Sequence, residues 1–184
     1  MKKGVLCPLR FTKLSLPGVF LVNLDPKADD RGLFVRSFCM KEFLDHNIEF
    51  TVKQTNISIN KKKGILRGLH YQEDPMGEDK LIQVISGRIF DIVIDLLRDS
   101  PTYCKWISIE LSDEGHSALL VPKGFAHGFQ TLTDNTVILY HMSEFYEPSH
   151  ARGIRWNDKQ FGITWPDRYP FLSERDNSFS DFTP

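Results

Sequence analysis

Short runs of alternating apolar and polar residues recur along most of the chain, and they limit its possible folds more than any other feature. The clearest runs span residues 32–38, 50–59, 65–71 and 106–111. A period of two places alternate side chains on opposite faces of a strand. Glycine and proline residues separate the runs, as they do at tight turns. Many short strands joined in this way predict an all-β sandwich or barrel.

Further strands are predicted over residues 19–24, 80–85, 88–96, 118–121, 127–132 and 136–142. Ser86 and Gly87 lie between two of these runs, as in the turn of a hairpin. Residues 40–46 carry apolar side chains at helical spacing and predict one helix in the first half of the chain. Residues 25–30 predict a turn-rich loop. Residues from 147 onward predict short helices and loops that pack over the sheets.

Composition excludes several classes of protein. The formal net charge of −1 indicates neither a nucleic-acid partner nor a basic membrane anchor. No apolar run approaches the length that spans a bilayer, and no long apolar segment follows Met1-Lys2-Lys3, as a signal peptide requires. Cys7, Cys39 and Cys104 share no CxxC spacing, which argues against a disulfide framework or a zinc site and favours a cytoplasmic location. GxGxxG, GxxxxGK[ST] and GxSxG motifs are all missing from the sequence.

Residues 64–72 place a guanidinium three positions before an imidazole, within a short apolar run. In a regular strand Arg67 and His70 point to opposite faces, but a twist or bulge at Gly68 brings them to one cavity. A fixed cation beside a titratable base suits an anionic substrate that must lose a proton. The competing interpretation is a surface arginine and a structural core histidine, and these residues alone favour it.

A second stretch, PKGFAHGF at residues 122–129, places His127 just after a Pro-x-Gly turn. Its spacing and that of residues 64–70 resemble the two motifs of the cupin superfamily, whose members are double-stranded β-helices. Metal-binding cupins carry a second histidine where this chain has Gln72. His70 and His127 alone are too few for a closed metal site, so a metal-free cupin is expected.

Three ordered motifs make the resemblance more specific: RGLHYQ (67–72), GFAHGF (124–129) and GIRWND (153–158). Together they resemble the nucleotide-sugar 3,5-epimerase family, over about the whole chain. The resemblance implies an all-β, cupin-type jelly roll with a few short peripheral helices. It also implies one domain over residues 1–184, with N-terminal strands and a dimer arm (1–60), a jelly-roll core (61–146) and a C-terminal cover (147–184).

The implied reaction is cofactor-independent inversion at C3, C5 or both in a nucleotide-linked 4-keto-6-deoxyhexose, or in its 3,6-dideoxy relative. Such sugars feed rhamnose- or ascarylose-type surface polysaccharides. Protons at both carbons are acidic because they lie next to the ketone. Inversion needs a base on one face, an acid on the other, and a group that stabilises the enolate oxygen. By resemblance these roles fall to His70 as base, Asp176 as its paired carboxylate, Tyr140 as acid and Lys80 as the cation near the ketone.

The resemblance also implies a set of substrate contacts. Arg67 suits the pyrophosphate, and Arg31 matches a residue that a partner subunit lends to the site. The other matching positions are Phe34, Gln54, Asn56, His127 and Tyr146. Two of these positions have structural alternatives, because His127 also suits a hydrogen-bonded core histidine and Tyr146 also suits simple packing.

One position departs from the family pattern. Members specific for dTDP-sugars usually have glutamate where this chain has Arg36. A carboxylate accepts from the N3–H of thymine, whereas an arginine fork donates to N3 and O2 of cytosine. Arg36 therefore leads to the hypothesis of a CDP-linked substrate, and a dTDP-linked substrate is an almost equal alternative. The structural alternatives are that Arg36 faces solvent or replaces another phosphate contact.

Other interpretations stay open. The resemblance implies a homodimer with crossing N-terminal strands, and no nucleic-acid or membrane partner. Related enzymes on this scaffold invert only C3 or only C5, and a 3,4-ketoisomerase uses similar acid and base groups. A sugar-binding cupin without activity is the non-enzymatic alternative.

Overall fold

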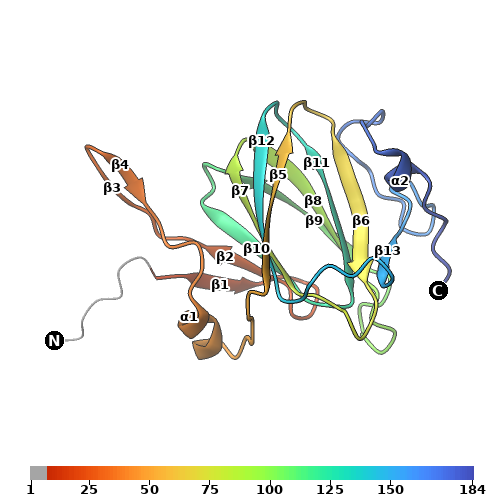
Figure 1. The fold of residues 1–184 in the computed structure, drawn as a ribbon, viewed down its shortest axis with the longest axis horizontal. Coiled ribbons are helices and arrows are strands. Elements are labelled where there is room, and N and C mark those ends of the chain that lie inside the picture. The colour runs from red at the N-terminus through yellow and green to blue at the C-terminus, as the bar shows by residue number, and fades with distance from the viewer. Residues whose placement is uncertain (1–7) are drawn as a thin grey trace.

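Two antiparallel sheets lie face to face in a computed structural model of the chain, which describes residues 8–184 (Figure 1). Cys7 and the Met1-Lys2-Lys3 start lie outside the described residues. The six-stranded sheet has the order β1 (Arg10–Lys13), β2 (Phe20–Asn23), β10 (Ser117–Val121), β7 (Lys80–Ser86), β12 (Thr136–Met142) and β5 (Gln54–Asn60). The five-stranded sheet has the order β13 (Ala151–Gly153), β6 (Leu66–Gln72), β11 (Phe125–Thr131), β8 (Arg88–Asp95) and β9 (Trp106–Ser112). This architecture confirms the expected jelly roll.

Period-two alternation fills the space between the sheets with one set of side chains and leaves the other set on the outer faces. The inner core includes Ile82, Leu119, Phe125 and Ile138, all essentially inaccessible to solvent. Burying each side chain of this size contributes about 1.5–3 kcal/mol.

Two further apolar clusters cover the outer faces. Helix α1 (Met40–Asp45) contributes Phe43, which packs with Phe50 and Leu81 on the outer side of the six-stranded sheet. The C-terminal segment contributes Phe161 and Trp165 against the outer side of the five-stranded sheet. This segment also carries α2 (Glu174–Asn177), which lies beside β6 and β13 in Figure 1. The prediction that the chain after residue 146 packs over a sheet is therefore confirmed.

Most predicted strands are present within one or a few residues of their expected bounds, and the helix over 40–46 is confirmed as α1. Three predictions were wrong. Residues 25–30 do not form only a loop, because β3 (Lys27–Asp29) pairs with β4 (Gly32–Phe34). The strand predicted to reach residue 38 ends at Phe34, and the one predicted from residue 50 begins at Gln54. The residues left out of these two strands, 35–38 and 50–53, turn their apolar side chains into the cluster around Phe43 of α1. Their alternating pattern therefore reflects packing against the helix rather than strand pairing.

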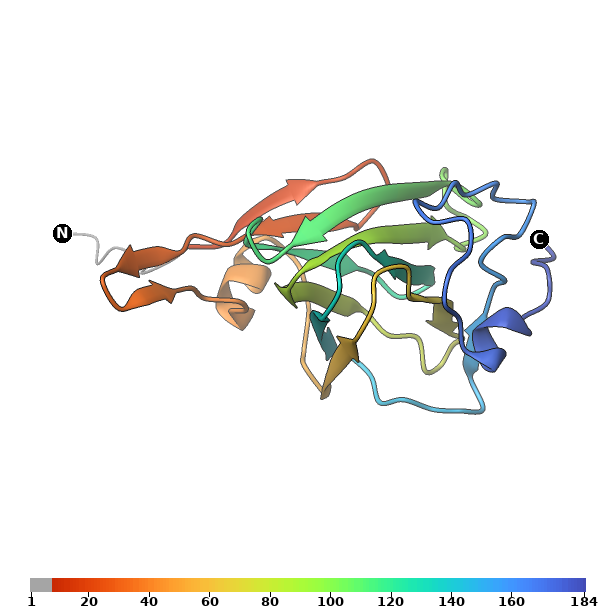
Figure 2. The ribbon, with the colours of Figure 1, turned by 90° about the horizontal axis from the view of Figure 1, so that it is seen from above.

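The β3–β4 hairpin projects from one end of the molecule, opposite the C-terminal segment (Figure 2). Every residue of both strands is exposed. Leu33 and Phe34 are 53% and 66% exposed, although both are large and apolar. The hairpin therefore contributes nothing to the core of its own chain. Cys39 and Cys104 are free thiols, and neither described helix has the length and hydropathy needed to cross a membrane.

A bulge in β6 decides which of its side chains face the cavity. His127 of β11 pairs with His70, and Phe129 pairs with Arg67, so β6 uses three steps where β11 uses two. The extra residue turns Leu66 and Leu69 outward into the C-terminal cluster, and Arg67 and His70 inward. The bulge predicted at Gly68 is thus confirmed. Gly68 has φ +132°, and a Cβ there would lie 2.5 Å from Cα of Gly128.

We expect Gly68→Ala to lower the free energy of unfolding by more than about 3 kcal/mol, because it adds both a steric overlap and backbone strain. Gly162→Ala is the matched control, since Gly162 also has a positive φ (+57°) but a Cβ added there would meet no atom within 4 Å. The control should lose only about 1 kcal/mol. Urea unfolding of both variants measures the difference, and equal losses would contradict the close-approach argument.

Candidate active site

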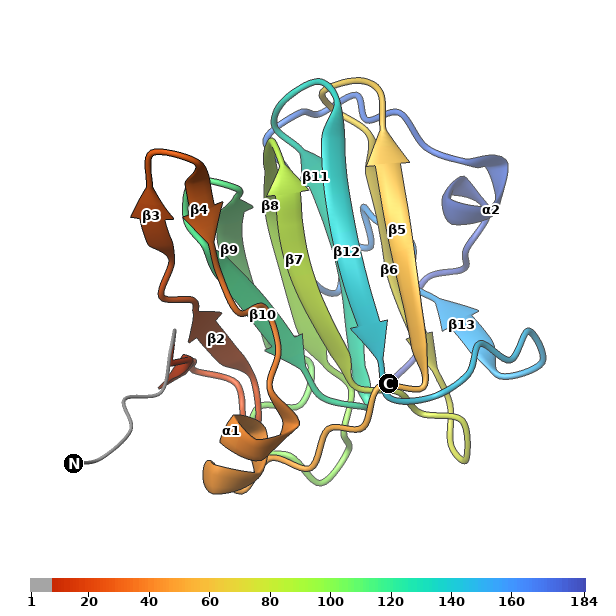
Figure 3. The ribbon, with the colours of Figure 1, turned by 60° about the vertical axis from the view of Figure 1, so that its left-hand side comes forward.

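A cavity of about 490 Å³ opens between the two sheets. Its walls come from β5 and β12 on one side and from β6 and β11 on the other, and Figure 3 shows these strands as facing layers. The cavity brings together seven of the residues that the sequence singled out: Asn56, Arg67, His70, Lys80, His127, Tyr140 and Tyr146.

His70 pairs with a carboxylate from the other end of the chain. Its Nε2 lies 2.7 Å from Oδ1 of Asp176, across 106 residues of sequence. The side chain of Ser173 accepts a hydrogen bond from the Asp176 amide and so caps α2, which fixes the carboxylate against β6. Burial of Asp176 opposes its ionisation, but the hydrogen bond with His70 and the attraction between the two groups outweigh burial and lower the pKa of Asp176.

Tyr140 faces the cavity from the opposite sheet. It lies on β12, beside Asn56 of β5 in the strand register. Burial raises its pKa well above the ordinary value, the negative charge of Asp91 adds to the rise, and Arg67 only partly opposes it. The phenol therefore stays protonated through the neutral range and is available as a proton donor.

His127 is buried and also lines the cavity. Its position therefore suits both a core histidine and a substrate contact. Its Nε2 lies 2.8 Å from Oδ1 of Asp91, although the geometry is not that of a hydrogen bond. Asp91 is completely buried on β8. Burial raises the pKa of Asp91, and the neighbouring imidazole partly opposes the rise. Asp91 was missed by sequence reasoning, and its only signal was an acidic residue within the otherwise apolar run IFDIVI.

Lys80 lies on β7 at the base of the cavity and is almost fully buried. Its Nζ lies 2.8 Å from Oε1 of Glu78 and donates a 3.3 Å hydrogen bond to the backbone oxygen of His70. Glu78 also lines the cavity. It was missed because it lies in the loop before β7, where a lone glutamate gives no periodic signal.

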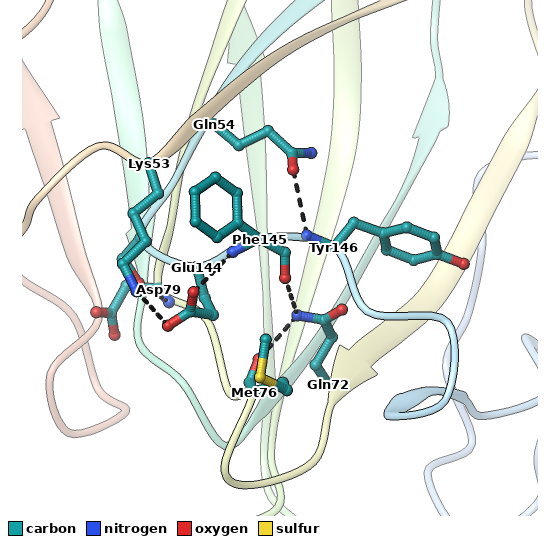
Figure 4. A network of polar contacts seen from close by, with 9 residues as sticks. Lys53, Gln54, Gln72, Met76, Asp79, Glu144, Phe145 and Tyr146 are labelled. Atoms are coloured by element: carbon teal, nitrogen blue, oxygen red, sulfur yellow. Dashed lines mark hydrogen bonds and ion pairs between the residues drawn. The ribbon is translucent and has the colours of Figure 1, made fainter.

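The segment after β12 forms one rim of the cavity, and Gln72 holds it in place (Figure 4). The Gln72 amide donates to the backbone oxygens of Met76 and Phe145, and it accepts from the amide of Glu147. Gln72 thus ties the rim to the loop before β7. Its position is the one where metal-binding cupins carry a histidine; the metal-free character of the site stays a prediction.

Two predicted contact residues lie at this rim. Gln54 accepts a hydrogen bond from the Tyr146 amide and lines a smaller adjoining pocket of about 300 Å³ rather than the main cavity. The Tyr146 hydroxyl accepts from the guanidinium of Arg175, at 3.3 Å. Arg175 lines the main cavity and was missed by sequence reasoning, although it directly precedes Asp176.

Three predicted residues lie away from the cavity of their own chain. Arg31 and Phe34 belong to the projecting hairpin, where Arg31 pairs with Asp29. Arg36 forms an ion pair with Glu42 of α1, and Glu42 also accepts from the backbone amide of Leu9.

The arrangement places a histidine–carboxylate pair on one wall and a protonated tyrosine with a lysine on the other. In a jelly roll, these are the features of a cupin-type carbohydrate epimerase. The family model described as dTDP-4-dehydrorhamnose 3,5-epimerase matches residues 13–183. The chain belongs to this family, and it is therefore an isomerase.

Individual relatives agree with the family assignment. The chain is 40% identical over 167 residues to dTDP-4-dehydrorhamnose 3,5-epimerase from Shigella flexneri, covering 89% of this chain and 91% of that protein. The crystal structure of the Bacillus anthracis enzyme with TDP and PPi bound is 38% identical, with a TM-score of 0.92 over 95% of this chain and 99% of that one. A 3'-monoepimerase from Streptomyces bikiniensis, in complex with dTDP-quinovose, is 30% identical, with a TM-score of 0.86 over 91% and 85% of the two chains.

The lowered pKa of Asp176 gives the His70 pair a defined dependence on pH. A carboxyl whose pKa is depressed by folding stabilises the protein above its unfolded pKa near 4, and this contribution is lost as the pH falls through the lower folded value. We expect Asp176→Asn to lose about 1–2 kcal/mol of unfolding free energy at pH 7. The difference from wild type should shrink below about pH 4.

Urea unfolding between pH 3 and pH 7 measures this difference. Asp99→Asn serves as control because Asp99 is exposed, and it should match wild type throughout. A loss in Asp176→Asn that stays constant down to pH 3 would show that the carboxylate charge plays no part.

Proposed function

We propose that this chain is a cofactor-independent epimerase that inverts C3 and C5 of a dTDP-linked 4-keto-6-deoxyhexose. The single observation that carries the proposal is the placement of the His70–Asp176 pair and Tyr140 on opposite walls of one cavity. A base and an acid on opposite faces of a flat enolate are what inversion at carbon requires. The relatives named for the dTDP-sugar 3,5-epimerase reaction favour the nucleotide.

The first step is removal of the proton at a carbon next to the ketone. Because Nε2 of His70 donates to Asp176, the lone pair of Nδ1 is available as the base. The C–H bond breaks, an N–H bond forms, and the electron pair moves to the ketone oxygen as an enolate. The ammonium of Lys80 stabilises the negative oxygen.

The second step returns a proton to the other face. Tyr140 donates its phenolic proton to carbon, and the enolate electrons re-form the ketone. Its raised pKa keeps the phenol protonated until a strongly basic enolate is present. Exchange of the imidazolium and phenolate with water then restores both groups. Repetition at the second carbon completes the double inversion.

A homodimer is part of the proposal. The hairpin residues Leu33 and Phe34 are large and apolar, yet 53% and 66% exposed. Ile57 and Ile59 on the edge strand β5 are 65% and 68% exposed, next to the cavity. A second copy that covers these apolar side chains would also bring Arg31 to the partner's cavity. The cytoplasmic location stays a prediction.

The hypothesis of a CDP-linked substrate remains open to the same experiments. By resemblance, dTDP-specific members have glutamate at the position of Arg36, and here Arg36 forms an ion pair with Glu42 of α1. If Arg36 selects the base, Arg36→Glu should shift the preference towards dTDP. An unchanged preference would remove Arg36 from base recognition.

The reaction itself is tested by deuterium incorporation in D2O, with dTDP-linked 4-keto-6-deoxyglucose and its CDP-linked counterpart. We expect label at both C3 and C5, and faster exchange with the dTDP sugar. Label at one carbon would establish a mono-epimerase, and migration of the ketone would establish a 3,4-ketoisomerase. Tight binding without exchange of either sugar would favour a binding module.

His70→Asn and Tyr140→Phe separate the two proton transfers. We expect His70→Asn to reduce exchange at both carbons by about 10²–10⁴-fold. Tyr140→Phe should still admit deuterium, because His70 can return it to the original face, but inversion should fall at least about 100-fold. NMR of the recovered sugar distinguishes label from inversion. Tyr169→Phe, at an 88% exposed position, is the control; loss of exchange in Tyr140→Phe would contradict the assigned order.

Subunit complementation tests the shared site. We expect Arg31→Ala and His70→Asn each to be nearly inactive, and a mixture of the two to regain about a quarter of wild-type activity. The regained activity comes from heterodimers in which an intact cavity meets an intact hairpin. A mixture of His70→Asn with Tyr140→Phe should regain far less if the hairpin alone is exchanged between subunits. No recovery in the first mixture after verified subunit exchange would mean that Arg31 does not act across the interface.

A further inference from the structure

We propose that Glu78 is a positioning and specificity residue: it holds the Lys80 ammonium at the base of the cavity and accepts a hydrogen bond from the substrate hydroxyl next to the ketone. The pair would then recognise an α-hydroxyketone, with Lys80 as donor to C=O and Glu78 as acceptor from C–OH. This inference rests on the proposed function and narrows its substrate class to sugars with a hydroxyl at C3.

Burial of the pair is the first observation. The Glu78 and Lys80 side chains are only 5% and 8% exposed, with Oε1 and Nζ 2.8 Å apart. Removing two charges from water costs several kcal/mol per ion, and a buried ion pair seldom recovers more than that cost. Apolar residues at both positions would stabilise the fold at least as well. The pair is therefore better explained by what it does in the cavity than by stability.

The contacts of Lys80 fix the direction of its charge. An ammonium has three N–H donors. One is directed to Glu78 and another to the backbone oxygen of His70. One donor remains for a ligand, and it lies on a side chain whose position is set by two partners. Because the second partner is the carbonyl of His70, the cation is also held close to the proposed base.

The second oxygen of Glu78 is the observation that points to a ligand. Oε2 is buried and lacks a hydrogen-bond partner among the described residues. A buried acceptor left in this state costs about 1–3 kcal/mol. Glu78 lines both the main cavity and the adjoining pocket, so a ligand in the cavity can supply the missing donor. A sugar hydroxyl is a donor that fits, whereas a phosphate would be repelled.

The loop that carries Glu78 is held at several points, so the carboxylate is in place before substrate binds. Gln72 bonds to Met76 within the loop, as Figure 4 shows. The Asp79 amide donates to the hydroxyl of Ser143, and Asp79 accepts from the Lys123 amide. Such supporting contacts limit the movement of a recognition group and reduce the entropy lost on binding.

An acceptor beside a donor matches one arrangement in the proposed substrate. In a 4-keto-6-deoxyhexose the C3 hydroxyl adjoins the C4 ketone, whereas a 3,6-dideoxy analogue has only CH2 there. The analogue would leave Oε2 of Glu78 unpaired in the complex. Sites built to bond a hydroxyl reject the analogue that lacks it far more strongly than apolar pockets reject a missing methylene.

The test compares these two sugars on wild type, Glu78→Gln and Glu78→Ala, with Glu110→Gln as control because Glu110 is exposed on β9. Deuterium incorporation at C5 is possible in both sugars and gives kcat and KM for each. We expect wild type to favour the hydroxylated sugar by at least about 100-fold in kcat/KM. Glu78→Ala should lower kcat for both sugars and bring the ratio between them to within about tenfold of unity, and the control should behave as wild type.

Calorimetric binding of both sugars separates this inference from the proposed function. If wild type exchanges deuterium with neither sugar, the proposed reaction fails, yet a preference for the hydroxylated sugar that Glu78→Ala removes would still support the Glu78 contact. An unchanged preference in Glu78→Ala, or equal binding of both sugars by wild type, would overturn it. Thermal unfolding checks that each variant folds. If Glu78→Ala does not fold, Glu78→Gln, which keeps the size of the side chain, still tests the role of the charge.

Discussion

The close contact between β6 and β11 at Gly68 and Gly128 is the constraint on which the site depends. Without side chains at these positions the strands can approach, and β6 can accommodate one extra residue. That residue changes the alternation of the whole strand: Leu66 and Leu69 bury under the C-terminal segment, while Arg67 and His70 turn into the cavity. The same packing brings α2, and with it Asp176, within reach of His70.

Burial acts differently on the acidic groups in and around the cavity. It raises the pKa of Tyr140 and of Asp91, which favours their protonated forms. It also opposes ionisation of Asp176, but the contact with His70 reverses the outcome there. Asp91 and Asp176 each have a histidine partner, so the complete burial of Asp91 accounts for its raised pKa. A single cavity between two sheets can therefore hold a hydrogen-bond acceptor for the imidazole on one side and a phenolic donor on the other.

The sequence predicted the strands with clear period-two patterns. It also indicated that a twist or bulge at Gly68 would turn Arg67 and His70 to one cavity, although these residues alone favoured a surface arginine and a core histidine. It did not predict β3, whose strand Lys-Ala-Asp has no apolar face, or β13, which owes its existence to pairing with β6. Asp91 and Glu78 were missed because their significance depends on partners that the fold supplies. Asp176 was placed by resemblance alone, since nothing in its neighbourhood indicates a contact 106 residues away.

The acid–base groups of the proposed reaction and the residues of the β3–β4 hairpin lie in different parts of the fold. His70, Tyr140, Lys80 and Asp176 are held by the two sheets and the segment that covers them. His70 pairs with Asp176 and Lys80 pairs with Glu78, both within the chain, and burial raises the pKa of Tyr140. Arg31 and Phe34 lie on an exposed hairpin that adds nothing to the core. Substitutions in the hairpin are therefore nearly free of cost to folding, whereas substitutions in the cavity disturb packed strands. In the proposed dimer this division would let the hairpin change without disturbing the acid–base groups. Arg36, which departs from the family pattern, lies outside both parts, where it pairs with Glu42 of α1.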